Sequence, residues 1–485
     1  MKIRLPLLFI CIFLFFSDLN GQSIFIRTFG FGRMNEAAWI GQTADLGYAI
    51  TGSTTGSWNE VPDMYLLRTD SSGTFLWSHL YGGNNIDQCK ATLMTSDHGF
   101  ILAGYTNSFN INNDYNGYLV RTDSIGNLLW SRTYGTSNWD LIESIAPTSD
   151  HGFITAGTSY GTSNGRPTGW ILRLDSVGGI VWEKFLDSPF DLQLKNIIPV
   201  QDGNFVACGY FIDSNTSKDE AYAVKINASN GDTLWNYFYQ GPEATRFHSI
   251  TEYNSGSLGL CGYMLTAADT NRDELIFGLN SSGIKIFENP LHENGKTEGF
   301  NKIMYVNDTL FAAGSTSTFG SGNQDYHLMQ FDTSGNFIYA ANWGGNDDEI
   351  CYSFVPTSDT GFALIGTTKS FGPTFQSIML VKTNHALTTT NVVTINVPEI
   401  SKENPFSIYP NPCSSLLTIF PNKLQNSTEN YSIRIFSSAG ILMKSISNKG
   451  ESLQISTEEF PNGLYLLQVI SMKGSTYNYR IIKED

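Results

Sequence analysis

Short apolar runs rich in β-branched and aromatic residues alternate with turn-forming residues along most of the chain. Between residues 141 and 186 four such runs follow one another: LIESIAPT, FITAGTS, WILRLD and IVWEKFL. Runs of this length, bounded by Gly, Asp, Asn and Ser, predict β-strands. The turns at residues 149–152 and 175–178 each contain a glycine, which allows the positive φ that tight hairpins need. The pattern therefore predicts a unit of four antiparallel strands.

A glycine near the end of the second run marks the period of this unit. It occurs at Gly52, Gly104, Gly157, Gly209, Gly262, Gly314 and Gly366, in steps of 52, 53, 52, 53, 52 and 52 residues. The Asp or Asn that ends the third run keeps the same spacing, at Asp70, Asp123, Asp175, Asn227, Asn280, Asp332 and Asn384. A fixed period of about 50 residues with four strands per copy is typical of propeller blades. We expect an all-β fold, a seven-bladed β-propeller.

The two ends of the repeat region complement each other. The seventh copy stops after its third strand, SIMLVKTN, at Asn384, whereas Ser23–Gly30 (SIFIRTFG) matches the fourth strand Leu128–Gly135 (LLWSRTYG), with Phe25 at the position of Trp130. An N-terminal strand that completes the last blade would close the ring and remove open sheet edges. This strand order resembles that of WD-repeat propellers, although the WD signature is absent. The resemblance implies that LIESIAPT-type strands are innermost and IVWEKFL-type strands outermost.

The remaining segments define the domain organisation. Lys2 and Arg4 precede an apolar stretch and then Asn20 and Gly21, which predicts a signal peptide at residues 1–21 and export to the periplasm. No later stretch is apolar enough to span a membrane. We expect the propeller at residues 22–385, a linker at 386–405, where the period is lost and Thr, Asn, Val and Ser dominate, and a small β-sandwich at 406–485.

The C-terminal region carries a family resemblance. Its motifs are Tyr409-Pro410-Asn411-Pro412, the run YSIRIFSSAGILMKS with Gly440 at its turn, FPNGLYLLQV with Gly463 and Tyr465, and the terminal RIIK. In this order they resemble the C-terminal sorting domain, type A, of type IX (Por) secretion substrates. The resemblance implies a Gram-negative bacterium of the Bacteroidetes type and type IX machinery as a partner. It also implies a secreted or outer-membrane surface location.

Composition and the absence of known motifs limit the partners and cofactors that the chain is expected to bind. The net charge of −16, with no run of Lys or Arg, argues against nucleic acid as a partner. No HExxH motif, zinc-spaced cysteine pair, G-x-S-x-G or phosphate-binding glycine loop is present, so we expect no metal and no cofactor. Cys208 and Cys261, each just before a period-marking glycine, are interpreted as buried fillers.

Two sets of repeated residues are interpreted as structural. The Asp and Asn residues that end the third strands precede a glycine or another turn residue, where their side chains cap the backbone. The aromatic residues of the fourth strands are interpreted as packing between blades. They are Trp77, Trp130, Trp182, Trp235, Phe287 and Tyr339.

One position on the predicted innermost strand varies while the rest of the strand stays uniform. It holds Ala38, Lys90, Glu143, Lys195, His248, Asn301 and Tyr352 in the seven copies. We expect it near the mouth of the central channel, either as solvated polar lining or as a ligand-binding set. The loops between second and third strands also vary and should open on the same face. Their aromatic residues are Trp58, Phe109, Tyr115, Tyr160, Phe319 and Phe371.

These features favour two hypotheses on function. The first is a secreted or surface-displayed binding module for a protein or a glycan, without catalytic activity. The alternative is a polysaccharide hydrolase or lyase at the channel mouth. Glu143, His248 and Tyr352 would then act as acid, base or charge stabilisers, flanked by Lys90 and Lys195.

Overall fold

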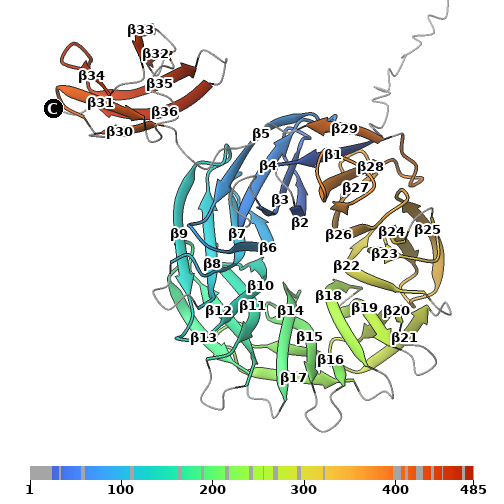
Figure 1. The fold of residues 1–485 in the computed structure, drawn as a ribbon. Helices are drawn as coiled ribbons and strands as arrows, with labels where there is room; N and C mark the ends of the chain where they lie inside the picture. Colours follow the sequence, from blue (N-terminus) through green and yellow to red (C-terminus); the bar gives the residue numbers. More distant parts are fainter. Residues whose placement is uncertain are drawn as a thin grey trace, which may run out of the picture. The chain divides into compact units, whose positions relative to one another are not determined.

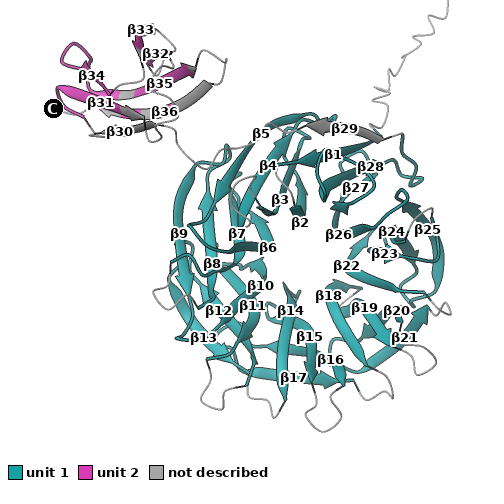
Figure 2. Ribbon diagram, viewed as in Figure 1, with its two compact units in different colours: residues 1–400 teal, residues 401–485 magenta. Residues whose placement is uncertain are grey.

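The computed structural model describes most of the chain between residues 24 and 483. The described ranges are 24–31, 34–55, 61–109, 114–161, 166–186, 190–212, 218–239, 244–254, 256–265, 271–291, 296–320, 323–390, 392–396, 406–409, 413–421, 430–437, 442–449, 452–471 and 476–483. The expected signal peptide lies outside them. Within these ranges, no helix has the length and hydrophobicity to span a membrane. The chain divides into two compact units, Met1–Ile400 and Ser401–Asp485 (Figure 2).

The first unit contains seven sheets, which Figure 1 shows around a common axis. Six of them consist of four antiparallel strands paired in chain order. Their strands are β2 (Met34–Gln42), β3 (Tyr48–Thr55), β4 (Pro62–Thr69), β5 (Phe75–Tyr81); β6 (Asp87–Met94), β7 (Phe100–Thr106), β8 (Asn116–Thr122), β9 (Leu128–Tyr134); β10 (Asp140–Pro147), β11 (Phe153–Ser159), β12 (Thr168–Leu174), β13 (Ile180–Phe185); β14 (Asp191–Pro199), β15 (Phe205–Ile212), β16 (Asp219–Ile226), β17 (Thr233–Phe238); β18 (Thr245–Tyr253), β19 (Ser257–Leu265), β20 (Arg272–Leu279), β21 (Lys285–Leu291); β22 (Glu298–Val306), β23 (Thr309–Thr316), β24 (Asp325–Phe331) and β25 (Phe337–Trp343). The seven-bladed β-propeller is confirmed.

The seventh sheet closes the ring. It is ordered β26 (Glu349–Pro356), β27 (Phe362–Thr368), β28 (Ser377–Thr383), β1 (Phe25–Gly30), β29 (Val392–Asn396). In the antiparallel pair of β1 with β28, Phe25 faces Lys382, as Trp130 faces Arg121 in the second blade. The seventh and first blades share a core that contains Phe25 and Phe29. The N-terminal strand therefore completes the last blade as expected.

The prediction that this strand is outermost is wrong. β29, within the segment interpreted as linker, pairs in parallel with β1, and Ile26 faces Val392. The unpaired N–H and C=O groups of an edge strand favour a further strand. The β-branched residues of β29 suit that role, although loss of the 52-residue period hid it.

Every innermost strand carries a β-bulge at the same place. In the third blade the register shifts between Ile142 and Ser144, so that Glu143 is the extra residue, and Ile142 faces Gly157. A Cβ on Gly157 would overlap the carbonyl oxygen of Leu141, well inside van der Waals contact. The same close approach occurs at all seven period-marking glycines. The repeat needs glycine there because the bulged strand lies against the backbone of its partner.

Five of the six fourth-strand aromatic residues pack between blades, as predicted; the exception is Tyr339, which is 49% exposed. Trp77, Trp130, Trp182, Trp235 and Phe287 each lie against a turn glycine of the next blade, namely Gly126, Gly178, Gly231, Gly283 and Gly335. Phe25 lies in the same way against Gly73 of the first blade. The repeated Asp and Asn residues cap their own turns; for example, the backbone N–H groups of Ser72 and Thr74 donate to Asp70 at 2.9 and 2.8 Å.

An ion pair recurs on the face of the ring that carries the tight turns. Among the described residues of five blades, a cation on the third strand pairs with an Asp in the turn between first and second strands. The pairs are Arg68–Asp45, Arg121–Asp97, Arg173–Asp150, Lys225–Asp202 and Lys382–Asp359. The hydrogen bond from Arg173 lowers the pKa of Asp150 to about 2. In the sixth blade the equivalent residues are the neutral Gln330 and Asn307.

The second unit is a β-sandwich of two sheets. One contains β30 (Phe406–Tyr409), β31 (Leu416–Pro421) and β34 (Leu453–Ser456); the other contains β33 (Leu442–Lys449), β32 (Asn430–Ser437), β35 (Gly463–Ser471) and β36 (Thr476–Lys483). Leu417 and Ile455 of the first sheet share a core with Ile435 and Leu467 of the second.

Candidate functional site

The seven variable positions identified in the sequence are the seven bulge residues. Ala38, Lys90, Glu143, Lys195, His248, Asn301 and Tyr352 each lie at the register shift of an innermost strand, and each is half-buried. A bulge redirects one side chain without changing the neighbouring pairing. Because the innermost strands surround the ring axis (Figure 1), the bulges form one circle of side chains, which we call the bulge ring.

Four members of the bulge ring link neighbouring blades. Lys195 Nζ lies 2.9 Å from Glu143 Oε1 in an ion pair. His248 Nδ1 lies 3.0 Å from the carbonyl oxygen of Phe300, and Asn301 Nδ2 donates to that of Cys351 at 2.8 Å. These bonds hold adjacent innermost strands together, so His248 and Asn301 also have a structural role.

The electrostatics of the bulge ring differ from residue to residue. Burial lowers the pKa of His248 to about 4, so its imidazole is neutral at pH 7 and donates its Nδ1 hydrogen to Phe300. Burial disfavours the charge on Lys90, but the surrounding acidic groups, Glu143 foremost and then Tyr105 and Glu36, together outweigh burial and raise the pKa of the amine. Burial and Glu36 raise the pKa of Tyr352. No hydrogen bond or ion pair joins Glu143, His248 and Tyr352, all of which the structure describes.

Beside the bulge ring lies a row of aromatic side chains that we call the aromatic ledge: Tyr105, Tyr115, Trp139 and Tyr160. Successive ring centroids are 5.5, 5.2 and 6.1 Å apart, and each pair meets edge to face. Backbone hydrogen bonds fix the row, because Asp140 N donates to Tyr115 O at 2.7 Å and Tyr160 N to Trp139 O at 2.8 Å. Trp139 is 49% exposed. The ledge therefore offers aromatic surface held rigidly at the loop face.

Cations stack on tyrosines in the second, fourth and fifth blades. Lys90 Nζ lies 5.7 Å from the ring centroid of Tyr105, which joins the bulge ring to the ledge. In the fourth and fifth blades the guanidinium of Arg246 lies 3.9 Å from the centroid of Tyr210, and that of Arg272 lies 4.5 Å from Tyr263. Such cation–π contacts keep charged groups in fixed positions.

The loop aromatics expected from the sequence separate into different roles. Tyr115 and Tyr160 belong to the ledge, whereas Phe371 packs against a blade core and Phe109 against Tyr118. Phe319 lies near His327, and Trp58 is outside the described residues. Trp139, which joins Tyr115 to Tyr160, was missed because it lies in the loop before an innermost strand. Tyr105, Tyr210 and Tyr263 carried a signal, since each directly follows a period-marking glycine.

No metal site is evident in the described part of the chain, because no three His, Cys, Asp or Glu side chains group there. All five described cysteines are free and buried. Cys208 and Cys261 therefore fill space as expected.

The second unit accounts for the sorting motif. Tyr465 is buried and donates its hydroxyl to Pro461 O at 2.6 Å, Gly463 has a φ of 153°, and the backbone of Tyr409 pairs with that of Thr418 in the first sheet. Pro410, Asn411, Pro412 and Gly440 lie outside the described residues. Residues 407–484 match the family described as secretion system C-terminal sorting domain. The second unit is a type IX secretion sorting domain. This sorting domain makes the type IX machinery a partner of the chain and directs export to the cell surface or beyond.

Comparison of the whole chain with known proteins assigns no function to it. No curated protein matches it. Among solved structures, Sqt1 from Chaetomium thermophilum is 12% identical, with a TM-score of 0.41 and coverage of 74% of this chain and 98% of that one. The β-propeller domain of the Trilobed protease from Pyrococcus furiosus is 9% identical, with a TM-score of 0.40 and coverage of 73% and 94%. Bombyx mori GH32 β-fructofuranosidase BmSUC1 is 11% identical, with a TM-score of 0.30 and coverage of 70% and 86%.

Proposed function

We propose that the propeller is an exported binding module whose aromatic ledge engages a glycan or a protein. The observation that carries this proposal is the row from Tyr105 to Tyr160, with Trp139 exposed at its centre. Fixed aromatic rings on a rigid frame give large contact area at little entropic cost. Lys90 beside Tyr105 adds a polar contact at the edge of the same surface.

Catalysis at the bulge ring receives less support. A general acid must carry a proton at the working pH, but His248 has a pKa of about 4 and donates its ring hydrogen to Phe300. Glu143 is neutralised by Lys195 at 2.9 Å. A hydrolase or lyase would show turnover of a polysaccharide that the Glu143→Gln and His248→Ala variants lose.

The binding proposal is tested with the exported chain, purified without its signal peptide. A glycan array and a set of bacterial envelope proteins are screened, and each hit is titrated against Trp139→Ala. We expect at least a tenfold loss of affinity, because exposed aromatic anchors dominate many interfaces. Tyr339→Ala is the matched control, since Tyr339 is also 49% exposed but lies on β25. Absence of any hit, or equal affinity of Trp139→Ala and wild type, contradicts the proposal.

A further inference from the structure

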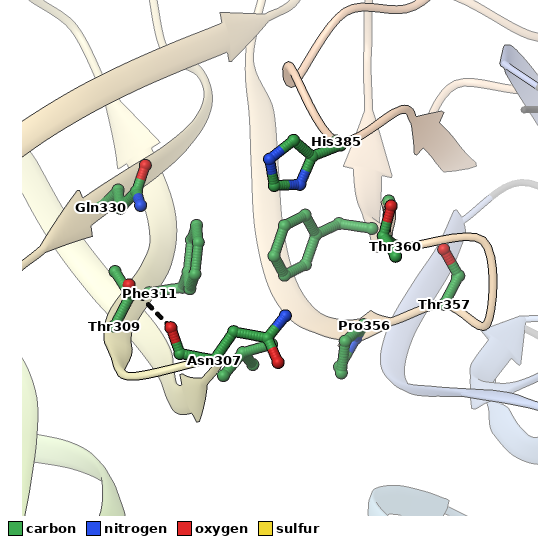
Figure 3. Close-up of a pocket in the computed structure, with 11 residues that line it drawn as sticks. Asn307, Thr309, Phe311, Gln330, Pro356, Thr357, Thr360 and His385 are labelled. Atoms are coloured by element: carbon green, nitrogen blue, oxygen red, sulfur yellow. Dashed lines mark hydrogen bonds between the residues drawn. The ribbon is translucent and has the colours of Figure 1, made fainter.

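A pocket of about 320 Å³ lies between the sixth and seventh blades. It opens on the face of the tight turns, opposite the aromatic ledge, and residues from the first turn of each blade line it. In Figure 3 Gln330 and Phe311 lie on the wall formed by the sixth blade, and His385 faces them from the seventh. Its size falls within the usual range for small-molecule sites, roughly 300–1,000 Å³.

Four of the residues that line this pocket differ from the residues at the same positions in the other repeats. Gln330 and Asn307 occupy the positions of the cation and the Asp that pair in five other blades. Phe311 is the only aromatic residue at its position, three residues before the period-marking glycine, where the other copies have Ala, Ile, Val or Gly. His385 follows the turn Asn where the others have Ser, Ala or Thr. Four changes scattered over nearly 80 residues thus meet in one place.

These changes exchange charge for neutral hydrogen-bonding groups. The described residues that line the pocket include no Asp, Glu, Lys or Arg. By contrast, the pocket of about 380 Å³ at the equivalent place between the first and second blades contains Asp45 and Arg68. Enclosing an ionised ligand without an opposite charge is costly, so the neutral lining disfavours ions.

The residues that line the pocket combine an apolar wall with neutral hydrogen-bonding side chains. Phe311 and Phe362 have ring centroids 4.6 Å apart and form an apolar wall. Around it stand the side chains of Gln330, Asn307 and His385, which can both donate and accept hydrogen bonds. A pyranose ring presents an apolar C–H face and a rim of hydroxyls that likewise donate and accept. We propose that this pocket binds one uncharged hexopyranose unit, independently of the aromatic ledge.

The test is saturation-transfer NMR and calorimetry on the full exported chain with glucose, galactose, mannose and N-acetylglucosamine as probes. We expect at least one of them to bind, and glucuronate and glucosamine not to bind. The double variant Asn307→Asp/Gln330→Arg installs the ion pair of the other blades and should weaken binding at least tenfold without lowering Tm. His385→Ser, which restores the turn residue of four other copies, should weaken it less.

The control variant is Arg68→Gln at the pocket between the first and second blades, which should leave sugar binding unchanged. Trp139→Ala should also leave it unchanged, so that failure of the ledge and failure of this pocket are distinguishable. The proposal is overturned if none of the four neutral sugars binds, if their binding survives the double variant, or if glucuronate or glucosamine binds in their place.

Discussion

At the scale of single residues, the period-marking glycines show how a repeat becomes visible in sequence. In each of the seven copies, a bulge on the neighbouring strand leaves no space for a Cβ, so only glycine fits at this position. The sequence revealed the glycine and, separately, the variable residue five positions before the end of each innermost strand. It could not reveal that the two belong to one bulge, because no local pattern specifies which residues of paired strands face each other.

Blade six allows this constraint to be measured. A Cβ on Gly314 would overlap the carbonyl oxygen of Gly299, whereas a Cβ on Gly299 would meet only the Cβ of Tyr263 at 3.7 Å. Gly314→Ala must therefore push the strands apart, and we expect Tm to fall by several degrees, since overpacking costs about 1–3 kcal/mol. Gly299→Ala should leave Tm nearly unchanged. Equal melting of the two variants would contradict the proposed reason for the repeat.

His248 gives a residue-scale prediction on pH. Its pKa in the folded protein is lowered by burial to about 4, whereas in the unfolded chain it returns to about 6.5. Below pH 6.5 the unfolded state binds a proton that the folded state rejects, so stability is lost as the pH falls from 6.5 toward 4. At about 1.36 kcal/mol per pKa unit, the loss approaches 3 kcal/mol. Asn at this position keeps a donor for Phe300 but does not titrate.

The measurement is Tm as a function of pH for wild type and His248→Asn. The wild-type curve should fall more steeply between pH 6.5 and 4, so that wild type loses stability relative to His248→Asn as the pH falls. Parallel curves would show that His248 takes up its proton equally in both states.

The aromatic ledge and the pocket show which parts of a binding site can be predicted from the sequence. Tyr115 and Tyr160 were found because they lie in loops that vary between copies. Trp139 lies between them in space but comes from another loop, and only the hydrogen bonds from Asp140 and Tyr160 bring the three together. The departures at Asn307, Phe311, Gln330 and His385 were visible one by one, yet their convergence depends on the packing of two blades.

At the scale of elements, the recurrent ion pair stabilises each blade by joining its third strand to its first turn. Asp150 and Arg173 are 23 residues apart, as are Asp45 and Arg68, and Asp97 and Arg121 are 24 apart, so a spacing of 23 or 24 residues was the available signal. The side chain of Arg173 is 8% exposed and also donates to the carbonyl oxygens of Leu174 and Phe153. Removal of its partner leaves a buried charge, which is costly.

A double-mutant cycle on this pair tests that account. We expect Asp150→Asn to cost about 1–3 kcal/mol, because Arg173 keeps its charge without a counterion. Adding Arg173→Gln creates the neutral combination that blade six uses, so the double variant should be more stable than the sum of the single changes predicts. Urea unfolding monitored by tryptophan fluorescence gives the free energies. Additive losses would show that the two side chains do not interact.

At the scale of the whole molecule, the repeat predicted the number of blades and the origin of the missing strand. The part it could not predict is β29, because a strand added in parallel outside the last blade belongs to no repeat. Its presence means that the ring unit extends beyond Asn384 and includes Val392–Asn396. The sorting domain has a separate core, so ring stability should not depend on it.

The prediction for the whole molecule concerns the closure of the propeller by β1. Deletion of residues 23–30 removes Phe25, Ile26 and Phe29, which are 2%, 6% and 0% exposed. The loss amounts to several kcal/mol at about 25 cal/mol per Å² of apolar area, and it exposes the edge of β28. The deletion also removes the phenyl group of Phe25, which packs on Gly73 of the first blade, so the first and seventh blades separate more easily. Tm should fall sharply and aggregation should increase.

Two C-terminal truncations complete the comparison. A chain that ends before Lys402 keeps β29 and loses only the sorting domain, so the melting of the ring should stay nearly unchanged. A chain that ends before Val392 also loses β29 and uncovers the outer edge of β1, so its Tm should lie between those of the first truncation and the N-terminal deletion. Calorimetry and light scattering give the order. If the N-terminal deletion is tolerated while loss of residues 402–485 destabilises the ring, then β1 does not close it and the two units do not fold independently.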